Sequence, residues 1–339
     1  MGKNTFFIGQ PVFNQLLNFI PQNIISSLVA KHKTDKYYKQ FKTNDHLVTM
    51  LYSCFHKCNS LREITTGMQV SYEKLFHLGL KNIPKRSTLS DANRNRSADF
   101  FAELYHSLYK HYYHFLSDSR PMNNIEKQLY ILDSTTIKLF SDIMKGAGSM
   151  PQNGKRKGGA KAHVLLNSNH DLPCLVRITE ARQNDKIIFP YIQLPPQSII
   201  VFDRAYRYYK IWEQFTKNKI TWVTRAIGDE YIVIDTERVI AEDCKQYGIV
   251  KDEHITLGRG INKATILKAR RIQFIDPVSN KNLIFFTNNS ELSPSQIAMI
   301  YKQRWQIEVF FKRLKQHNQL RYFLGDNANP QSLNTIFEW

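Results

Sequence analysis

The sequence predicts a multidomain protein of the α+β or α/β class, with an all-α N-terminal domain and a mixed-sheet domain that a β-rich insertion interrupts. Three observations support this prediction. The 339 residues exceed the roughly 250 to 300 residues at which a single core stops growing. Apolar residues recur with helical periodicity up to about residue 120. Short strand-like runs dominate from residue 128 onward.

The first 120 residues are expected to form the all-α N-terminal domain. Pro84 breaks the chain inside it, and Ser87 or Thr88 can cap a new helix. Because this helix carries Arg94 and Arg96, it fits a DNA groove, as the second helix of a helix-turn-helix does. An exposed basic helix on a helical bundle explains the same pattern, and the sequence leaves both interpretations open. The other helical patterns cover residues 13–19, 47–55, 61–68, 75–80 and 99–116.

The mixed sheet is expected to occupy residues 128–225 and 283–324, with the β-rich insertion at 226–282. A polar segment that contains Pro121 precedes the sheet and marks a domain boundary. The apolar run 199–202 is typical of a buried parallel strand. Ser293 and Pro294 are expected to begin one long helix that ends near residue 318. Further strands are expected at 130–140, 162–167, 174–179, 221–224 and 283–287, and further helices at 184–192 and 208–217.

The composition indicates a polyanionic partner. Lys and Arg number 47 against 29 Asp and Glu, which gives a formal net charge of +18. The excess is spread along the chain, so a long contact surface explains it better than a basic tail does. Double-stranded DNA fits such a surface best. A basic but otherwise ordinary protein remains the alternative on charge alone.

Three carboxylates stand out by their positions. Asp133 lies in the middle of a predicted strand, where an acid is unfavourable unless it has a partner. Asp203 follows the apolar run 199–202, so it lies at the carboxyl end of a buried strand, where open α/β sheets bind ligands. Glu308 lies inside the long last helix. Taken singly, each acid is typical of an ordinary structural or capping residue.

The last helix has an unusual distribution of charge. At roughly 100° per residue, Glu308 falls in one sector with Tyr301, Arg304 and Lys315, beside an apolar stripe at positions 300, 307, 311 and 314. The excess of cations around a single acid repels itself unless an anion is present. The pattern therefore predicts that Glu308 holds a metal ion and that its neighbours hold a phosphate chain.

The chemistry of the three acids narrows the choice of metal. Asp and Glu supply only hard oxygen ligands, which favour Mg²⁺ or Mn²⁺ over zinc. Two such ions can activate water on one side of a phosphodiester and stabilise the leaving oxygen on the other. Since the acids are separated by 70 and 105 residues, only a fold can bring them together.

These motifs resemble those of bacterial DDE transposases, specifically the insertion-sequence four family. Leu-Asp-Ser-Thr around Asp133 resembles that family's first aspartate motif, and Phe-Asp-Arg-Ala-Tyr around Asp203 resembles its second. The resemblance extends over nearly the whole chain. Four further positions match the spacing of the family's Tyr-Arg-Glu-Lys signature: Tyr301, Arg304, Glu308 and Lys315.

The resemblance implies a fold, an activity and roles for these residues. The catalytic core would be ribonuclease-H-like, with Asp133, Asp203 and Glu308 as catalytic residues that bind two Mg²⁺ or Mn²⁺ ions. The implied activity is cut-and-paste transposition: cleavage at the inverted-repeat ends of an insertion sequence and strand transfer to target DNA by a homodimer in a synaptic complex. Contacts to the DNA backbone are implied for Tyr301, Arg304 and Lys315.

Further DNA contacts are expected beside a basic loop. Lys157 and His163 lie where this loop joins a strand, although a plain solvated loop explains the same residues. Asn184 and Asp185 predict a helix cap, and they could instead face the metal ions. Core packing is expected for both Trp222 and Trp305, with stacking on an unpaired base as the alternative.

The remaining features concern compartment and completeness. Four cysteines without paired spacing indicate a reducing compartment. Residues 1–21 have no pattern of a signal peptide or spanning helix, so we expect a cytoplasmic, nucleoid-associated protein without a membrane contact. Residues 325–339 are expected to be an atypical, truncated tail. A catalytically impaired transposase that acts only as a DNA-binding protein is therefore the alternative function.

Overall fold

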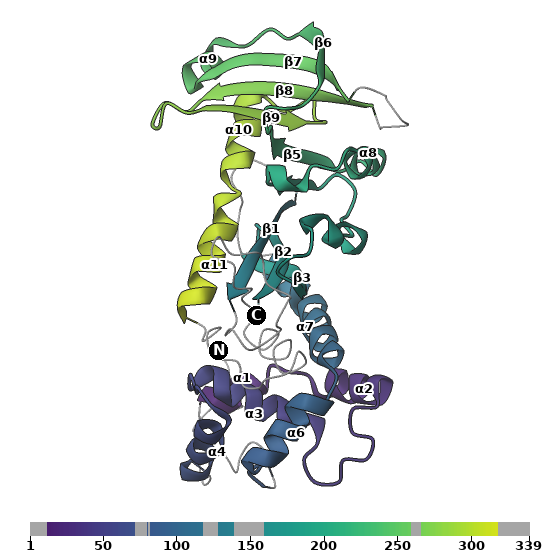
Figure 1. The fold of residues 1–339 in the computed structure, drawn as a ribbon, viewed down its shortest axis with the longest axis vertical. Helices are drawn as coiled ribbons and strands as arrows, with labels where there is room; N and C mark the ends of the chain where they lie inside the picture. Colours follow the sequence, from purple (N-terminus) through teal and green to yellow (C-terminus); the bar gives the residue numbers. More distant parts are fainter. Residues whose placement is uncertain are drawn as a thin grey trace, which may run out of the picture. The chain divides into compact units, whose positions relative to one another are not determined.

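The computed structural model describes residues 12–71, 80, 82–117, 128–138, 159–258 and 266–317 (Figure 1). The chain divides into two compact units. One consists of residues 1–118, 137–160 and 312–339, and the other of residues 119–136 and 161–311. Lys157 and the tail 325–339 lie outside the described residues. Within the described ranges, no helix has the length and apolar character needed to cross a membrane.

Residues 12–117 of the first unit are helical where the structure describes them, as the periodicity predicts, and the helix expected at 75–80 lies outside the described residues except for residue 80. One core of this unit contains Met50, Ile64 and Leu89, and a second contains Leu28 and Phe100. The predicted caps of one helix are wrong, because that helix begins at Arg86 and its N-cap residue, Lys85, makes no side-chain cap hydrogen bond. The helices are α1 (Val12–Leu17), α2 (Gln22–His32), α3 (Thr43–Phe55), α4 (Leu61–Val70), α6 (Arg86–Asn95) and α7 (Ala98–Ser117).

The second unit is built on one mixed sheet of nine strands, in the order β3-β2-β1-β4-β5-β9-β8-β7-β6. β1, β4 and β5 run parallel, whereas β5, β9, β8, β7 and β6 pair antiparallel. The strand predictions from 130 to 287 are confirmed within the described residues. The strands are β1 (Leu129–Lys138), β2 (Gly159–Asn167), β3 (Leu172–Glu180), β4 (Ile199–Phe202), β5 (Thr221–Arg225), β6 (Ile232–Glu237), β7 (Ile249–Leu257), β8 (Leu267–Ile275) and β9 (Asn282–Thr287).

The β-rich segment 226–282 extends this sheet. It supplies β6, β7 and β8 together with the short helix α9 (Glu242–Tyr247). β8 pairs with β9, and β9 pairs with β5, so the backbone hydrogen bonds of the segment continue those of the parallel strands. The domain boundaries given above stay a prediction.

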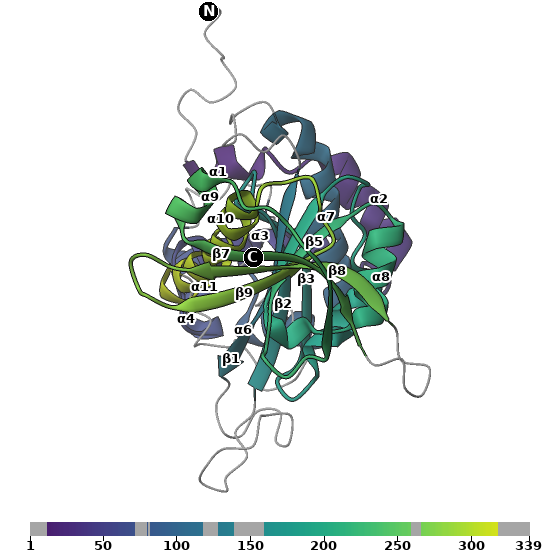
Figure 2. The ribbon, with the colours of Figure 1, turned by 90° about the horizontal axis from the view of Figure 1, so that it is seen from above.

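Helical elements cover both faces of the sheet. One face carries Leu132, Phe202 and Trp222 and packs against η3 (Asp185–Tyr191), η4 (Arg204–Tyr206) and α8 (Tyr209–Lys217). The other carries Leu129 and Val201 and packs against α10 (Pro294–Lys302). Figure 2 shows α8 and α10 on opposite sides of the strands. The segment predicted as a helix over 184–192 forms a 3₁₀-helix with Pro190 inside it.

The long last helix is broken, which corrects the prediction of one continuous helix. Its start is as predicted, because Ser293 and Gln296 form a capping box at α10. α10 ends at Lys302, and α11 (Trp305–His317) begins after a turn at Gln303 and Arg304. Hydrogen bonds of the i to i−3 kind tighten the chain there, such as Arg304 N–H to Tyr301 O at 3.0 Å. The predicted apolar stripe is confirmed, since Ile300, Ile307, Phe311 and Leu314 are buried.

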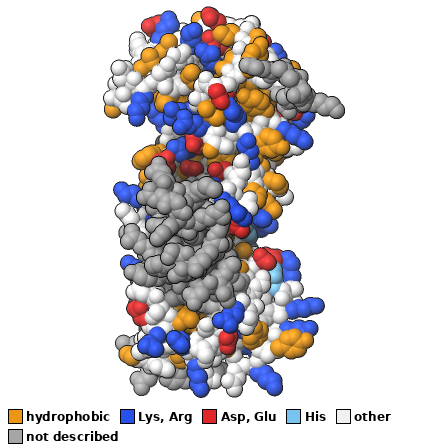
Figure 3. Space-filling model, in the orientation of Figure 1, with side chains coloured by type: hydrophobic (Ala, Val, Ile, Leu, Met, Phe, Trp, Pro, Cys, Tyr) orange, Lys and Arg blue, Asp and Glu red, His pale blue; other side chains and the backbone are white. Residues whose placement is uncertain are grey.

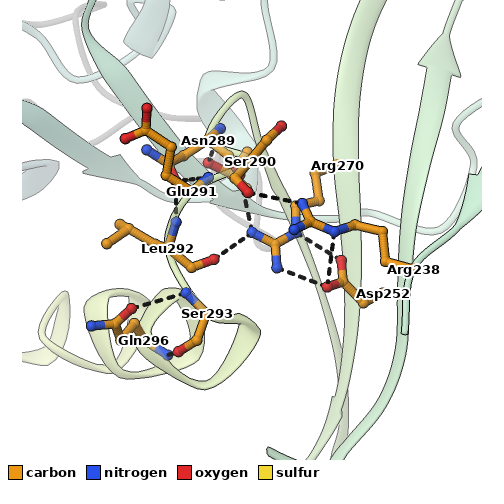
Figure 4. Close-up of polar contacts among 10 residues, drawn as sticks. Arg238, Asp252, Arg270, Asn289, Ser290, Glu291, Leu292, Ser293 and Gln296 are labelled. Carbon is orange, nitrogen blue, oxygen red and sulfur yellow. Dashed lines mark hydrogen bonds and ion pairs between the residues drawn. The ribbon is translucent and has the colours of Figure 1, made fainter. Parts of the chain in front are cut away.

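A buried arginine fastens β7 and β8 to the loop that precedes α10 (Figure 4). Arg270 donates from Nε and Nη2 to the two carboxylate oxygens of Asp252, each at 2.7 Å. Its Nη1 donates to the backbone oxygens of Asn289 and Leu292 at 3.1 and 2.6 Å. Arg238 donates to Ser290 O at 3.0 Å. These contacts fix the loop whose last residue caps α10.

Candidate functional site

Asp133 lies near the middle of β1, and its side chain is only 19% exposed. The backbone N–H of Ser134 donates to Asp133 Oδ1 at 2.8 Å. Burial raises the pKa of Asp133 to about 6, and the nearby carboxylates of Asp203 and Glu308 act in the same direction. The Ser134 N–H and the Arg304 guanidinium oppose this rise. Asp133 therefore lies within the electrostatic reach of both other predicted acids.

Asp203 comes directly after β4 and lies next to Asp133 because of strand register. β1 and β4 are parallel, and Leu132 is paired with Phe202. The residues that follow this pair, Asp133 and Asp203, consequently reach the same edge of the sheet. The carboxyl end of β5 is adjacent, since Phe202 is also paired with Thr224. The sequence prediction for these strands is thus consistent with the observed register.

Arg304 lies in the turn between α10 and α11 and contacts both Asp133 and Glu308. Its Nη1 donates to Asp133 Oδ2 at 3.0 Å, and its Nη2 donates to Glu308 Oε1. The Arg304 side chain is 18% exposed and that of Glu308 is 33% exposed. A fixed positive charge thus lies between two partly buried carboxylates, where it offsets their mutual repulsion.

The donor chemistry of this cluster fits a divalent cation of the Mg²⁺ type. The three acids offer only oxygen ligands, and like charges raise the pKa of Asp133 in the absence of a further cation. Within the described ranges, no group of three His, Cys, Asp or Glu side chains has a metal-binding arrangement. The Arg304 guanidinium lies between Asp133 and Glu308 and is not itself a ligand. The oxygen chemistry of the three side chains fits such an ion.

The remaining signature residues have different surroundings. Tyr301 is 9% exposed, and its ring packs on Phe285 with 4.8 Å between centroids. Burial raises the pKa of Tyr301, and the Arg304 guanidinium opposes that rise. Lys315 lies on α11 and is exposed. The side chain of Lys315 is therefore more accessible to a ligand than that of Tyr301.

Two cations expected at DNA are buried, which corrects their assignment as direct contacts. His163 is 0% exposed, and its Nε2 is hydrogen-bonded to Thr179 Oγ1 at 2.9 Å. Arg96 is 2% exposed and lies over the rings of Tyr38 and Phe41. A side chain enclosed in this way cannot reach a phosphate without local unfolding. Arg94 on α6 is exposed, so its position permits a DNA contact.

The two tryptophans discussed above have opposite environments. Trp222 is fully buried and stacks on Trp212 with 4.8 Å between ring centroids, as expected for a core residue. Trp305 is 62% exposed, so the expectation of core packing is wrong for it. The first residue of α11 therefore presents an indole ring to solvent.

A polar cluster of Asp185, Ser134 and Lys161 lies on the opposite face of β1. Asp185 accepts a hydrogen bond from Ser134 Oγ at 2.7 Å and lies 3.2 Å from Lys161 Nζ. Asn184 caps the 3₁₀-helix, as predicted, by accepting from Lys186 N–H. The sequence signal for Asp185 was its place after the third core strand. Nothing in the sequence indicated its contact with Ser134, the neighbour of Asp133.

Lys and Arg side chains are distributed over both units on the face drawn in Figure 3. This distribution agrees with a charge excess that is spread along the chain. Among the residues that the structure describes, Arg304 is the cation in direct contact with Asp133 and Glu308. The site is therefore an acidic centre within a protein of high positive charge.

Asp133 on β1 and Asp203 just after β4 lie on adjacent parallel strands, and Glu308 of α11 is linked to Asp133 by Arg304 from the turn before that helix. Acids in this arrangement on an α/β sheet define a class of candidate acidic sites. Residues 124–325 match the family described as "Transposase DDE domain". The chain belongs to this DDE transposase family. Residues 8–81 match a second family, described as "Domain of unknown function (DUF4372)".

Proteins with transposase names resemble this chain. One from Sinorhizobium fredii, named y4zB, is 29% identical over 251 residues, which are 74% of this chain and 67% of that protein. One from Geobacillus stearothermophilus, named for insertion sequence element IS5377, is 25% identical over 60% of this chain and 52% of its own length. One from Synechocystis, named for element IS4SA, is 25% identical over 72% of this chain and 65% of its own length. The chain thus spans about half to two thirds of these relatives.

A solved structure of the piggyBac transposase synaptic complex with hairpin DNA also resembles the chain. The similarity covers 96% of this chain and 71% of that one, at 11% identity and a TM-score of 0.42. Such a score is too low to define the fold or the function.

Proposed function

We propose that this protein is a DNA transposase of the insertion-sequence four type, which binds the inverted-repeat ends of its element and catalyses metal-dependent strand cleavage and transfer. The observation that carries the proposal is that Arg304 pairs with both Asp133 and Glu308, while Asp203 lies close enough to raise the pKa of Asp133. The strand order β3-β2-β1-β4-β5, with parallel β1, β4 and β5, supports a ribonuclease-H-like core. Membership of the DDE transposase family supports the same conclusion.

Asp133, Asp203 and Glu308 would hold the metal ions, for which we propose two Mg²⁺ or Mn²⁺. When bound, such ions supply a nucleophile and stabilise the leaving oxygen of a phosphodiester. The protein's own contribution is to bring carboxylates from β1, from the end of β4 and from α11 to one end of the parallel strands. Arg304 serves this purpose before ions bind, because it pairs with Asp133 and Glu308.

The DNA backbone would be held by cations around this centre. Arg304 and Lys315 would contact phosphates at the cleaved end, with Tyr301 beside them. Arg304 can leave its carboxylate partners for a phosphate, since a guanidinium binds both anions in similar geometry. We further propose a homodimer in a synaptic complex, because two element ends must be held together for transfer.

Cleavage of DNA that carries the inverted repeats flanking the gene tests the proposal. Wild-type protein is expected to nick this DNA with Mg²⁺ or Mn²⁺, and Asp133→Asn is expected to bind it without nicking. Glu213→Gln is the matched control, because Glu213 is an acid of α8 whose ion pair is with Lys217. Binding without nicking by the wild-type protein would favour a DNA-binding role only. Nicking that ignores the end sequence would indicate a nuclease in place of a transposase.

A further inference from the structure

Asp185 is an acid of the second unit that stands behind the proposed metal ligands. Its Oδ1 accepts from Ser134 Oγ at 2.7 Å. Lys161 Nζ lies 3.2 Å and His163 Nδ1 3.6 Å from the same oxygen. The Asp185 side chain is 22% exposed, so these contacts form in a partly desolvated place where polar interactions are strong.

The two faces of β1 separate Asp185 from Asp133. Side chains of successive strand residues point to opposite faces, so Ser134 shares the face of Leu132, and Asp133 shares the face of Leu129. Asp185 therefore contacts Ser134 from the face covered by η3 and η4, whereas Arg304 contacts Asp133 from the face covered by α10. β1 is held from both sides at these two neighbouring residues.

Ser134 connects the two faces through its own atoms. Its hydroxyl donates to Asp185, and its backbone N–H donates to Asp133 Oδ1 at 2.8 Å. A fixed side chain at Ser134 restricts rotation of the strand at this point, and the N–H then stays directed at the Asp133 carboxylate. The lone pairs of Asp133 Oδ2 are left for Arg304 or for an ion.

The carboxylate of Asp185 also lies close enough to Tyr206 to affect the pKa of that residue, as do Asp133 and Asp203. Tyr206 of η4 is buried, and burial raises its pKa. The carboxylates of Asp185, Asp133 and Asp203 each add to that rise. Lys161 Nζ pairs with the carboxylate that accepts from the Ser134 hydroxyl.

We propose that Asp185 is a positioning residue that fixes the Asp133 carboxylate through Ser134. The inference rests on the proposed function, because it concerns the ion that Asp133 would hold. Residues that orient metal ligands from behind usually change the metal affinity about 10-fold to 100-fold when they are removed. A similar effect is expected here, although Asp185 does not touch the ion.

Binding of Mn²⁺ alone to the full chain, followed by electron paramagnetic resonance of the free ion, tests the proposal. Asp185→Asn keeps the shape but loses the charge, and it is expected to weaken Mn²⁺ binding by roughly tenfold. Ser134→Ala is expected to weaken it similarly, and Ser134→Thr, which keeps the hydroxyl, is expected to restore most of the affinity. Because both residues act in one chain of contacts, the double variant Ser134→Ala/Asp185→Asn should be no weaker than the weaker single variant.

Controls separate this inference from the proposed function and from a purely structural effect. Glu180→Gln, an exposed acid paired with Arg182, should leave Mn²⁺ binding unchanged. Equal Mn²⁺ affinity of wild-type and Asp133→Asn protein would overturn the proposed function itself. If Asp133→Asn loses the ion but Asp185→Asn does not, only the positioning role of Asp185 fails. That role also fails if Ser134→Ala and Ser134→Thr bind Mn²⁺ with equal affinity. If Asp185→Asn does not fold, the comparison of these two Ser134 variants tests the positioning role in its place.

Discussion

The guanidinium of Arg304 lies 3.0 Å from the carboxylate of Asp133, although 171 positions separate the two residues in the chain. The same guanidinium contacts Glu308, four residues further along. Arg304 therefore offsets the repulsion between these two carboxylates by its own charge. Under the proposed function, in which the acids hold metal ions and Arg304 contacts DNA, metal binding and DNA binding would be linked through the same arginine contacts.

Replacement of Arg304 should make the protein depend more strongly on metal ions for stability. Arg304→Ala leaves the carboxylates of Asp133 and Glu308 without their partner, which should lower the free energy of unfolding of metal-free protein by about 1.5 to 3 kcal/mol. The rise in melting temperature on addition of Mn²⁺ should then exceed that of the wild type. Thermal unfolding with and without Mn²⁺ measures both effects. Arg182→Ala, at an exposed ion pair, is the control, and an equal Mn²⁺ response in both variants would contradict the idea.

His163 should make folding stability depend on pH. Burial lowers the pKa of His163 to about 4, from the ordinary histidine value of 6.5. The unfolded chain therefore binds the proton more readily, and stability is lost as the pH falls from 6.5 towards 4. Between pH 7 and pH 5 this group should cost the folded state roughly 2 kcal/mol. Urea unfolding at the two pH values should show a smaller loss for His163→Gln than for the wild type, and parallel losses would refute the assignment.

DNA binding should distinguish exposed from buried cations by its salt dependence. Each phosphate contact that is lost should reduce the slope of log K against log salt by about 0.9. Lys315→Gln is therefore expected to flatten the slope for a mixed-sequence duplex, since Lys315 is exposed on α11. His163→Gln should leave the slope of the folded protein unchanged, because that side chain is buried. A slope that falls in His163→Gln and not in Lys315→Gln would reverse these assignments.

The sequence predicted those parts of the fold that follow from local pattern. The apolar run 199–202 is β4, and its parallel pairing with β1 brings Asp203 beside Asp133 as strand logic requires. The start of α10 followed from Ser293 and Pro294, and the capping box that Ser293 forms with Gln296 is also local. The correct predictions of β4 and of the start of α10 thus depended on residues that are close together in the sequence.

Features that depend on distant contacts were not predictable in the same way. The turn at Gln303 and Arg304 interrupts an otherwise regular helical pattern, and the side chain of Arg304 finds its partner on a strand early in the second unit. Arg96 and His163 are cationic residue types that usually lie at the surface, yet tertiary packing encloses both. Their burial depends on neighbours such as Phe41 and Thr179.

The order of strands in the sheet has a consequence for biosynthesis. The turn that carries Arg304 and the helix that carries Glu308 follow all nine strands in the chain. A nascent chain that has reached Thr287 has both aspartates and still lacks Arg304 and Glu308. The carboxylate of Asp133 therefore emerges from the ribosome before its guanidinium partner, and a chain interrupted after β9 has no Arg304 to pair with it.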